Sequence, residues 1–375
     1  MTTLIQTKPL CAIGLMSGTS LDGIDIAVLT TNGEIVSKFG PAATVPYNRK
    51  LREKVRSTLG GVGDTSGAEA LVTEAHIVAV RTFLTEHGLN APEIDLIGLH
   101  GHTILHRPLI GKTWQIGDGK RLAQELSIDV VADFRGADVE GGGEGAPLAP
   151  IFHQSLAHAL EHPLCVLNIG GVANVTWINR KEMVAFDTGP GSALIDDWML
   201  QHTGQEMDAR GMLAATGQID EMAVKELLSD PYFSRSAPKS LDRNHFSERA
   251  ATLLAKRTPA DGVATLTTFT ARAVRLALQE FPKAPRQFLV CGGGRKNDTL
   301  MQTLHMELST QVKSVESVGW RGDAMEAQLM AFLAVRSRYR LPLSFPTTTG
   351  VASPTTGGRL FRAAPNTNEA AGRRT

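Results

Sequence analysis

The chain has 375 residues, 42% of them hydrophobic, and its 38 Lys and Arg residues balance its 38 Asp and Glu residues. This length exceeds one ordinary hydrophobic core and favours two domains, while the balanced charge argues against a binder of nucleic acid or membrane surfaces. We therefore expect a globular protein whose partners are small molecules.

The chain shows no charged leader followed by an apolar stretch, and no run near the roughly 20 apolar residues that span a bilayer, so we expect a cytoplasmic location. Three cysteines, Cys11, Cys165 and Cys291, lack the spacing of a metal site and are expected to be buried thiols.

The N-terminal segment predicts a β-hairpin whose turn could hold phosphate. Two apolar runs, 12–16 and 24–29, flank the polar turn at residues 18–23. Glycines let the backbone approach a ligand, hydroxyl and amide groups donate hydrogen bonds, and carboxylates can organise a divalent cation. The side chains with these properties are Ser17, Thr19, Ser20, Asp22 and Asp25. The alternative interpretation of this turn is a polar hairpin without a ligand.

The rest of the first half alternates helix-like and strand-like runs, which is typical of an α/β protein. Residues 69–86 predict a helix, and residues 94–99 predict a short strand that ends at His100-Gly101-His102. No carboxylate or cysteine nearby would complete a zinc site with these histidines, so we interpret them as substrate contacts, which Gln115 and Asp118 could join.

A second polar group, Asp133-Phe134-Arg135, follows the strand predicted before it. Arg135 is suited to holding a carboxylate or phosphate with two parallel hydrogen bonds, and Asp133 could bind sugar hydroxyls. A structural pair of arginine and aspartate explains the same residues equally well.

A glycine cluster at residues 141–145 predicts a hinge, after which the pattern begins again. A strand at 164–169, the turn Gly170-Gly171 and a return strand at 173–178 repeat the arrangement at the start of the chain, which indicates two similar domains around a cleft. A third turn, Gly292-Gly293-Gly294, follows the strand predicted at 287–291. Three such turns indicate a bound nucleotide, with two turns on its phosphates and the third against its base and ribose.

Asp187 is the best candidate for catalysis. It ends a short predicted strand before a turn rich in glycine and proline, where a carboxylate can take a proton from an attacking hydroxyl or water. Its alternative role is to cap the following turn or helix. Glu326 follows the predicted helix cap Asp323 and could complete a capping box, or order Mg²⁺ or the attacking water.

Taken together, these motifs resemble those of the anhydro-N-acetylmuramic acid kinases, which are sugar kinases of the actin, hexokinase and Hsp70 superfamily. The resemblance runs from Ile13 to about Leu360, and such a series of motifs in order is highly specific. The motifs lie at residues 14–25, 133–135, 142–148, 167–174, 186–191, 291–294 and 323–327.

The resemblance implies an α/β fold with two domains, the actin-like ATPase (duplicated ribonuclease H-like) fold, with a cleft between its domains. The N-terminal lobe would span residues 1–140, with the C-terminal helix able to complete it, and the second lobe would span 141–362. The polar tail at 363–375 is expected to be disordered.

The resemblance also implies a reaction that uses ATP and Mg²⁺. The enzyme would hydrolyse the 1,6-anhydro ring of 1,6-anhydro-N-acetylmuramic acid and phosphorylate O6, giving N-acetylmuramic acid 6-phosphate and ADP during cell-wall recycling. A homodimer is implied as well. The alternatives are a hexose or N-acetylhexosamine kinase without ring hydrolysis and an actin-like ATPase.

The resemblance assigns roles residue by residue, with Asp187 as the general base. The expected ATP contacts are Gly18, Thr19, Ser20, Leu21, Asp22, Gly23, Ile24, Asp25, Gly170, Gly171, Gly292, Gly293 and Gly294. The expected sugar contacts are Ser17, His102, Gln115, Asp118, Asp133, Arg135 and Asn174, and the expected Mg²⁺ ligands are Asp22, Asp25 and Glu326. The chain departs from the family pattern at His102, Asp118 and Ser192, where Gln, Asn and Asn are usual.

Overall fold

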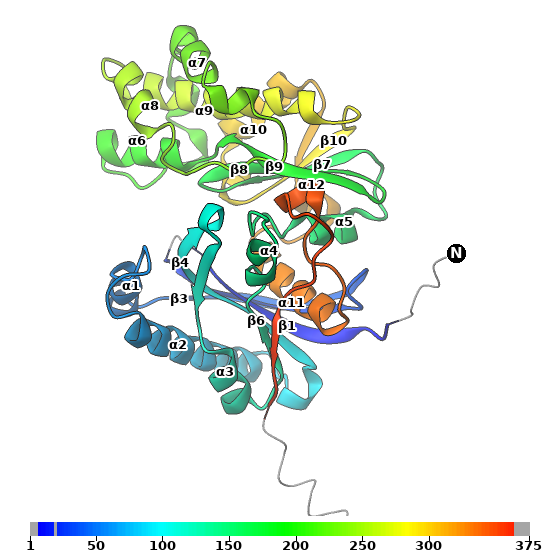
Figure 1. Ribbon diagram of the computed structural model, residues 1–375. Coiled ribbons are helices and arrows are strands. Elements are labelled where there is room, and N and C mark those ends of the chain that lie inside the picture. Colours follow the sequence, from blue (N-terminus) through cyan, green and yellow to red (C-terminus); the bar gives the residue numbers. More distant parts are fainter. Residues whose placement is uncertain (1–6, 19–20, 364–375) are drawn as a thin grey trace, which may run out of the picture. The chain divides into compact units, whose positions relative to one another are not determined.

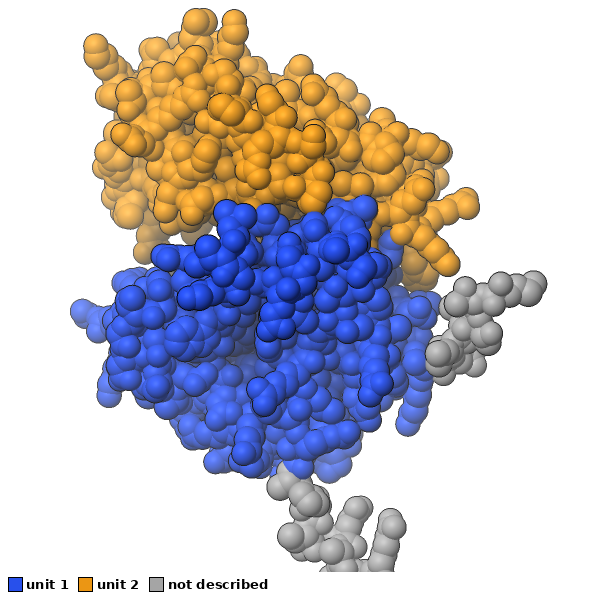
Figure 2. All heavy atoms as spheres, viewed as in Figure 1, with its two compact units in different colours: residues 1–156, 324–375 blue, residues 157–323 orange. Residues whose placement is uncertain are grey.

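The computed structural model describes residues 7–18 and 21–363. Of these, the residues up to Leu156 and from Ala324 onward form one compact unit, unit 1, and Ala157–Asp323 form another, unit 2 (Figure 2). The lobe boundary predicted from the sequence, at residues 140 and 141, falls within unit 1. Residues 364–375 of the predicted tail lie outside the described part of the chain.

Unit 1 is built on a sheet with the order β12-β6-β4-β1-β2-β3, and β5 pairs with β4 outside this path. Its strands are β1 (Leu10–Ser17), β2 (Gly23–Thr31), β3 (Val36–Pro46), β4 (Leu96–Arg107), β5 (Lys112–Ile116), β6 (Val130–Ala132) and β12 (Arg359–Phe361). Neighbours among β1, β2 and β3 are antiparallel, whereas β4 runs parallel to β1 and β6 parallel to β4. The hairpin predicted across residues 18–23 is therefore confirmed.

Helices cover both faces of this sheet (Figure 1). The helices that begin in unit 1 are α1 (Arg49–Arg56), α2 (Thr65–Glu86), α3 (Gly119–Leu126), α4 (Gly136–Glu140), α5 (Pro150–Ala157), α11 (Met325–Arg338) and α12 (Pro346–Thr349). Helix α2, predicted at 69–86, begins at Thr65 because the Asp64 side chain accepts a hydrogen bond from Gly67 N and caps it. It packs against β2, β4 and β5, and α11 packs against β1, β2 and β4.

Two glycines allow α11 to lie directly on the sheet. A Cβ atom at Gly14 of β1 would lie 1.7 Å from the carbonyl oxygen of Ala327, and one at Gly98 of β4 would lie 2.1 Å from that of Met330. No side chain fits at such distances, so only glycine permits this approach of helix to strand. The contact fixes the start of α11, including Glu326, beside the β1–β2 hairpin.

Unit 2 is built on a sheet with the order β11-β10-β7-β8-β9. Its strands are β7 (Leu164–Ile169), β8 (Val172–Asn179), β9 (Glu182–Pro190), β10 (Gln287–Cys291) and β11 (Gln311–Ser314). Its helices are α6 (Ala193–Thr203), α7 (Glu221–Leu228), α8 (Ser247–Leu254), α9 (Pro259–Leu276) and α10 (Asp298–Leu308). Helix α9 packs against β9, α6 and α10 (Figure 1).

The two sheets share one topology. In unit 1 the path β3-β2-β1-β4-β6 consists of an antiparallel meander followed by two parallel strands, and the path β9-β8-β7-β10-β11 of unit 2 has the same directions in the same order. The predicted α/β class and the predicted repeat are thus confirmed at the level of strand order.

One predicted strand end is wrong. The sequence places the end of β4 at His100, but the strand continues to Arg107. Gly101 adopts a φ of 72°, and β5 adds antiparallel pairing from His102 to Arg107. His102, at the predicted end of the strand, is therefore paired on both sides, with Ser17 of β1 and with Ile116 of β5.

The remaining composition-based expectations have mixed outcomes. Cys165 and Cys291 are buried, as expected, but Cys11 is only half-buried. Across residues 7–18 and 21–363, no helix is both long enough and apolar enough to cross a membrane.

Candidate functional site

The turn between β1 and β2 is anchored by backbone hydrogen bonds. Leu21 N donates to Gly18 O at 3.1 Å, and Tyr47 N donates to Asp22 O at 2.9 Å. Leu21 is buried and has a φ of 59°, a left-handed conformation that costs energy in a residue with a Cβ atom. Such strain is found disproportionately at ligand-binding turns. Two of the expected ATP contacts in this turn, Thr19 and Ser20, lie outside the described residues.

Gly23 and Ile24, which were also expected to contact ATP, begin β2 and are buried. A Cβ atom at Gly23 would lie 2.4 Å from Val45 O, so close packing against β3 accounts for glycine there. Ile24 is 1% exposed and belongs to the hydrophobic core of unit 1. The structure gives both residues packing roles.

A buried hydrogen-bonded chain beside this turn connects the last residue of β1, the middle of β4 and the residue that follows β3. Ser17 and His102 are register partners on β1 and β4. The Tyr47 hydroxyl donates to Ser17 Oγ at 2.7 Å, and Ser17 Oγ lies 2.9 Å from His102 Nδ1. Burial lowers the pKa of His102 to about 4, so the ring is neutral at pH 7. Ser17 and His102, two of the expected sugar contacts, are therefore linked by a hydrogen bond.

Three carboxylates gather near the same turn. Surrounding protein atoms, and then the charges of Asp25 and Asp22, raise the pKa of Glu326, while Arg135 opposes that rise. Glu326 nevertheless keeps exposed surface. The Thr44 hydroxyl donates to Asp25 Oδ1 at 2.5 Å. These three carboxylates supply the hard oxygen atoms that Mg²⁺ prefers, and their mutual repulsion would be relieved by a cation.

Within the described residues, no group of three or more His, Cys, Asp or Glu side chains has the arrangement of a complete metal site. This arrangement is compatible with nucleotide-bound Mg²⁺, which usually keeps several waters and takes only one or two protein carboxylates besides phosphate oxygens.

Arg135 is held by neutral partners. Its Nε and Nη2 atoms lie 3.2 and 3.0 Å from His100 Nε2, and Nη1 donates to Gly145 O at 2.7 Å. Burial, and then the positive charge of Arg135, lowers the pKa of His100 to about 3, which keeps the histidine an uncharged acceptor. The alternative of an Arg135–aspartate pair is not what the structure shows, because neither partner is a carboxylate. Burial lowers the pKa of the guanidinium, and the charges of Glu326 and Asp138 act on it without a direct ion pair.

Two further expected sugar contacts share a cavity of about 250 Å³ in unit 1. Gln115 and Asp133 line it together with His100, Trp114 and Arg359. The Asp133 backbone is left-handed, with a φ of 58°, and its Oδ1 accepts from Gly136 N at 3.0 Å.

Asp118 has a structural role. Its Oδ1 accepts from Lys120 N and Arg121 N at 2.9 and 3.0 Å and caps α3. A carboxylate engaged in this way stabilises the helix whether or not it also reaches a ligand.

In unit 2, a polar row crosses the sheet at the carboxyl end of β7. Asn168 on β7 pairs in register with Asn174 on β8, and Asn174 pairs with Asp187 on β9. Opposed residues on neighbouring strands project from the same face, so the three side chains form one row. All three are half-buried. Asn174, expected as a sugar contact, thus neighbours the expected base.

Asp187 lies within β9 rather than at its end, and a distant segment holds it. Asp187 Oδ2 accepts from Leu241 N at 2.8 Å, its backbone N donates to Lys239 O at 2.9 Å, and its carbonyl oxygen accepts from the Tyr232 hydroxyl at 2.5 Å. Burial, and then the charge of Asp187, raises the pKa of Tyr232, which keeps that hydroxyl a donor. The residue at the N-terminus of α6 is Ser192, so Asp187 does not cap that helix. The sequence carried no signal for these supporting contacts.

The two glycine turns of unit 2 follow neighbouring parallel strands. Gly170 and Gly171 follow β7, and Gly292 follows β10, which pairs with β7. Ligands of α/β sheets bind where the carboxyl ends of parallel strands meet. Packing explains Gly294, whose added Cβ atom would lie 2.4 Å from Ile169 Cγ2, but a Cβ atom at Gly293 would meet nothing within 4 Å. Gly293 thus leaves open space for a ligand.

Charged side chains flank the first of these turns. A Cβ atom at Gly171 would lie 3.7 Å from Arg243 Nε, and Arg243 pairs with Asp197 at 2.9 Å. Burial raises the pKa of Asp196, in the first turn of α6, to about 6. None of Asp196, Asp197 and Arg243 was singled out from the sequence.

The expected site residues thus fall into two sets, each ordered within its own unit. Unit 1 brings together Ser17, Asp22, Asp25, His102, Arg135 and Glu326. Unit 2 brings together Gly170, Gly171, Asn174, Asp187, Gly292, Gly293 and Gly294.

Comparisons with known proteins cover nearly the whole chain. A family model described as anhydro-N-acetylmuramic acid kinase matches residues 10–363. A curated relative of that name from Paramagnetospirillum magneticum is 52% identical over 349 residues, which is 93% of this chain and 98% of the relative. Relatives of that name from Acidiphilium cryptum and Rhodopseudomonas palustris are 48% and 47% identical, and each alignment covers 94% of this chain and 99% of the relative.

Proposed function

The chain belongs to the anhydro-N-acetylmuramic acid kinase family, and we propose on that basis that it is an ATP-dependent kinase acting on 1,6-anhydro-N-acetylmuramic acid. It would hydrolyse the 1,6-anhydro ring and phosphorylate O6, giving N-acetylmuramic acid 6-phosphate and ADP. The observation that carries this proposal is the row Asn168–Asn174–Asp187, which lies next to two glycine turns at the carboxyl ends of adjacent parallel strands. This arrangement provides a carboxylate base beside a place for a nucleotide.

We assign the nucleotide to the glycine turns. Residues 18–25 and Gly170-Gly171 would contact its phosphates, and residues 292–294 its base and ribose. The open space at Gly293 and the strained backbone of Leu21 support this assignment. Asp22, Asp25 and Glu326 would hold Mg²⁺ with the phosphate oxygens, and when bound the ion would supply charge stabilisation during phosphoryl transfer.

We assign the sugar to the polar side chains around these turns. Ser17 and His102 would present ordered hydrogen-bonding groups, and Arg135 would bind the lactyl carboxylate, because its only hydrogen-bonding partners given by the structure are uncharged. Asn174 lies next to Asp187 in register and would hold the sugar toward the base.

We infer that Asp187 acts as a general base. It would take a proton from water as the water oxygen bonds to the anomeric carbon. The bond from that carbon to O6 breaks, and O6 bonds to the γ-phosphorus while ADP departs. The hydrogen bond from Leu241 N fixes one carboxylate oxygen, so the base is held in place before the substrate arrives.

One incubation tests the proposed function. The protein is mixed with ATP, Mg²⁺ and 1,6-anhydro-N-acetylmuramic acid in water enriched in ¹⁸O, and the product is identified by mass. One ¹⁸O at C1 together with phosphate on O6 is expected. A phosphorylated sugar without ¹⁸O would indicate a hexose or N-acetylhexosamine kinase instead. A rate of ADP release that is the same with and without the sugar would indicate an actin-like ATPase.

We also propose that the protein is a cytoplasmic homodimer, on the strength of family membership alone. Sedimentation velocity over a range of concentrations tests the oligomeric state. A single species with the mass of one chain would contradict it.

A further inference from the structure

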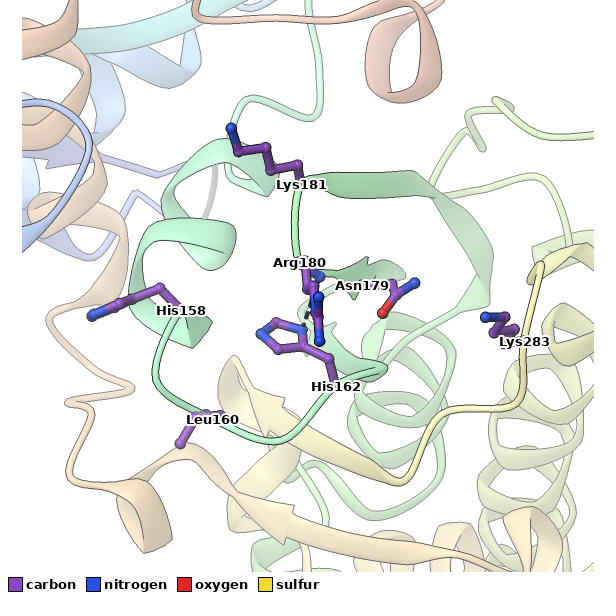
Figure 3. Close-up of a pocket in the computed structure, with 7 residues that line it drawn as sticks. All are labelled: His158, Leu160, His162, Asn179, Arg180, Lys181 and Lys283. Carbon is purple, nitrogen blue, oxygen red and sulfur yellow. Dashed lines mark hydrogen bonds between the residues drawn. The ribbon is translucent and has the colours of Figure 1, made fainter. Parts of the chain in front are cut away.

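A basic pocket lies in unit 2, away from the polar row. It has a volume of about 830 Å³, which is in the range of small-molecule sites. Figure 3 shows the segment 158–163 and the β8–β9 turn framing it, with Arg180 drawn beside His162. The polar and charged residues that line it are His158, His162, Asn179, Arg180, Lys181 and Lys283.

Three of these side chains carry positive charge without an internal counterion. Arg180, Lys181 and Lys283 are exposed, and none of them takes part in a salt bridge within residues 7–18 and 21–363. Two acidic side chains neighbour these segments in the sequence: Glu182 accepts from Asn179 Nδ2 at 3.0 Å and adds one negative charge beside the pocket, and Glu161 pairs with Arg286 at 3.6 Å. The pocket therefore has a net excess of positive charge.

The β8–β9 hairpin orders the backbone around Arg180. Asn179 and Glu182 are register partners, so Arg180 and Lys181 form a two-residue hairpin loop. Arg180 has a φ of 57° there, at a position where glycine or asparagine is favoured. Its backbone N is 3.2 Å from His162 Nδ1 and donates to it. The hairpin turn and the hydrogen bond to His162 thus hold the backbone of Arg180 at the pocket.

This pocket is separate from the proposed active site. It includes Asn179 at the end of β8, five residues beyond Asn174. At about 3.3 Å per residue, the two lie ~16 Å apart along the strand. A ligand in this pocket therefore does not occupy the place of the sugar at Asp187.

We propose that this pocket binds a small anion with two or more phosphate groups. The cations come from two chain segments, since Arg180 and Lys181 belong to the β8–β9 loop and Lys283 to the segment before β10. A ligand that contacts both segments needs anionic groups at two points, and phosphate oxygens suit the lysine and arginine donors. Asn179 and His162 add uncharged polar groups. The proposal does not depend on the catalysed reaction.

Calorimetric titration of the full chain with tripolyphosphate tests this proposal. Titrations run with and without a non-hydrolysable ATP analogue separate binding at a nucleotide site from binding at the pocket. We expect one binding event to persist with the analogue and to weaken about tenfold in Lys181→Ala/Lys283→Ala, because each lost contact with an exposed lysine is modest. The control Lys225→Ala/Lys313→Ala removes the same charge from exposed lysines elsewhere in unit 2 and should change binding less than about twofold.

A third variant separates binding from folding. Arg180→Gly relieves the left-handed strain while removing the charge, so it should weaken tripolyphosphate binding without lowering the melting temperature. Inorganic phosphate and glucose 6-phosphate, which carry one phosphate group, should bind at least about tenfold more weakly than tripolyphosphate. Three results would each overturn the proposal. The first is an equal loss of tripolyphosphate affinity in the two double lysine variants, and the second is the loss of all binding when the ATP analogue is present. The third is equal affinity for ligands with one and with three phosphate groups.

Discussion

Replacing Asp187 by asparagine removes the proposed base while keeping its surroundings. Two of the three anchors, to Lys239 O and from the Tyr232 hydroxyl, use the backbone of residue 187 and persist in Asp187→Asn. The third, from Leu241 N, passes from a carboxylate to an amide oxygen, and a hydrogen bond to a neutral acceptor is about 1 kcal/mol weaker. The fold should therefore survive, whereas loss of a general base lowers turnover at least about 100-fold, or about 2.7 kcal/mol in the barrier.

The assay measures ADP release under saturating sugar and ATP, with nucleotide affinity measured separately by calorimetry. Nucleotide affinity should stay within about threefold of the wild type, because the proposed phosphate contacts are made by the glycine turns. Glu182→Gln is the matched control, since it removes one exposed carboxylate from the other end of the same strand. Turnover of Asp187→Asn within about tenfold of the control would refute the reasoning.

Three further predictions concern folding and sugar binding. Gly14→Ala should destabilise unit 1 by about 3 kcal/mol or prevent its folding, because the new Cβ atom would meet the Ala327 carbonyl, and a preserved melting temperature would contradict this. Arg135→Lys cannot keep the forked contacts to His100 and Gly145, so KM for the sugar should rise at least about tenfold with little change in KM for ATP; an equal rise in both would disprove a specific role in sugar binding. The raised pKa of Asp196, about 6, means that between about pH 4 and 6 the folded state holds a proton that the unfolded state has lost, so Asp196 lowers the unfolding free energy as pH rises through that range. Buried histidines whose pKa values are lowered to about 3 or 4, such as His100 and His102, raise it over the same range, so denaturant titrations should show a steeper rise of the unfolding free energy with pH in Asp196→Asn than in the wild type.

Local patterns were enough to predict two of the hairpins. The alternation of apolar runs and glycine turns predicted β1–β2 and β7–β8, and the repeat of that pattern predicted two similar domains, whereas β3, β5, β11 and β12 were not predicted. These features depend on residues close in sequence, where turn chemistry and side-chain periodicity act directly.

Contacts between distant segments were not predictable in the same way. The extension of β4 to Arg107 depends on pairing with β5, and the partner of Arg135 proved to be His100, 35 residues earlier, rather than an aspartate. The support of Asp187 by Leu241 spans 54 residues. A single sequence contains no periodic signal for such pairs, because each depends on how whole elements pack.

The central claim is that Asp187 takes the proton from the water that attacks the anomeric carbon. A crystal structure of the complex with a non-hydrolysable ATP analogue, Mg²⁺ and 1,6-anhydro-N-acetylmuramic acid tests it most directly. We predict the terminal phosphate against residues 18–25 and an Asp187 carboxylate oxygen about 3 Å from a water poised at the anomeric carbon. A sugar bound more than about 8 Å from Asp187, with another group against that water, would contradict the account.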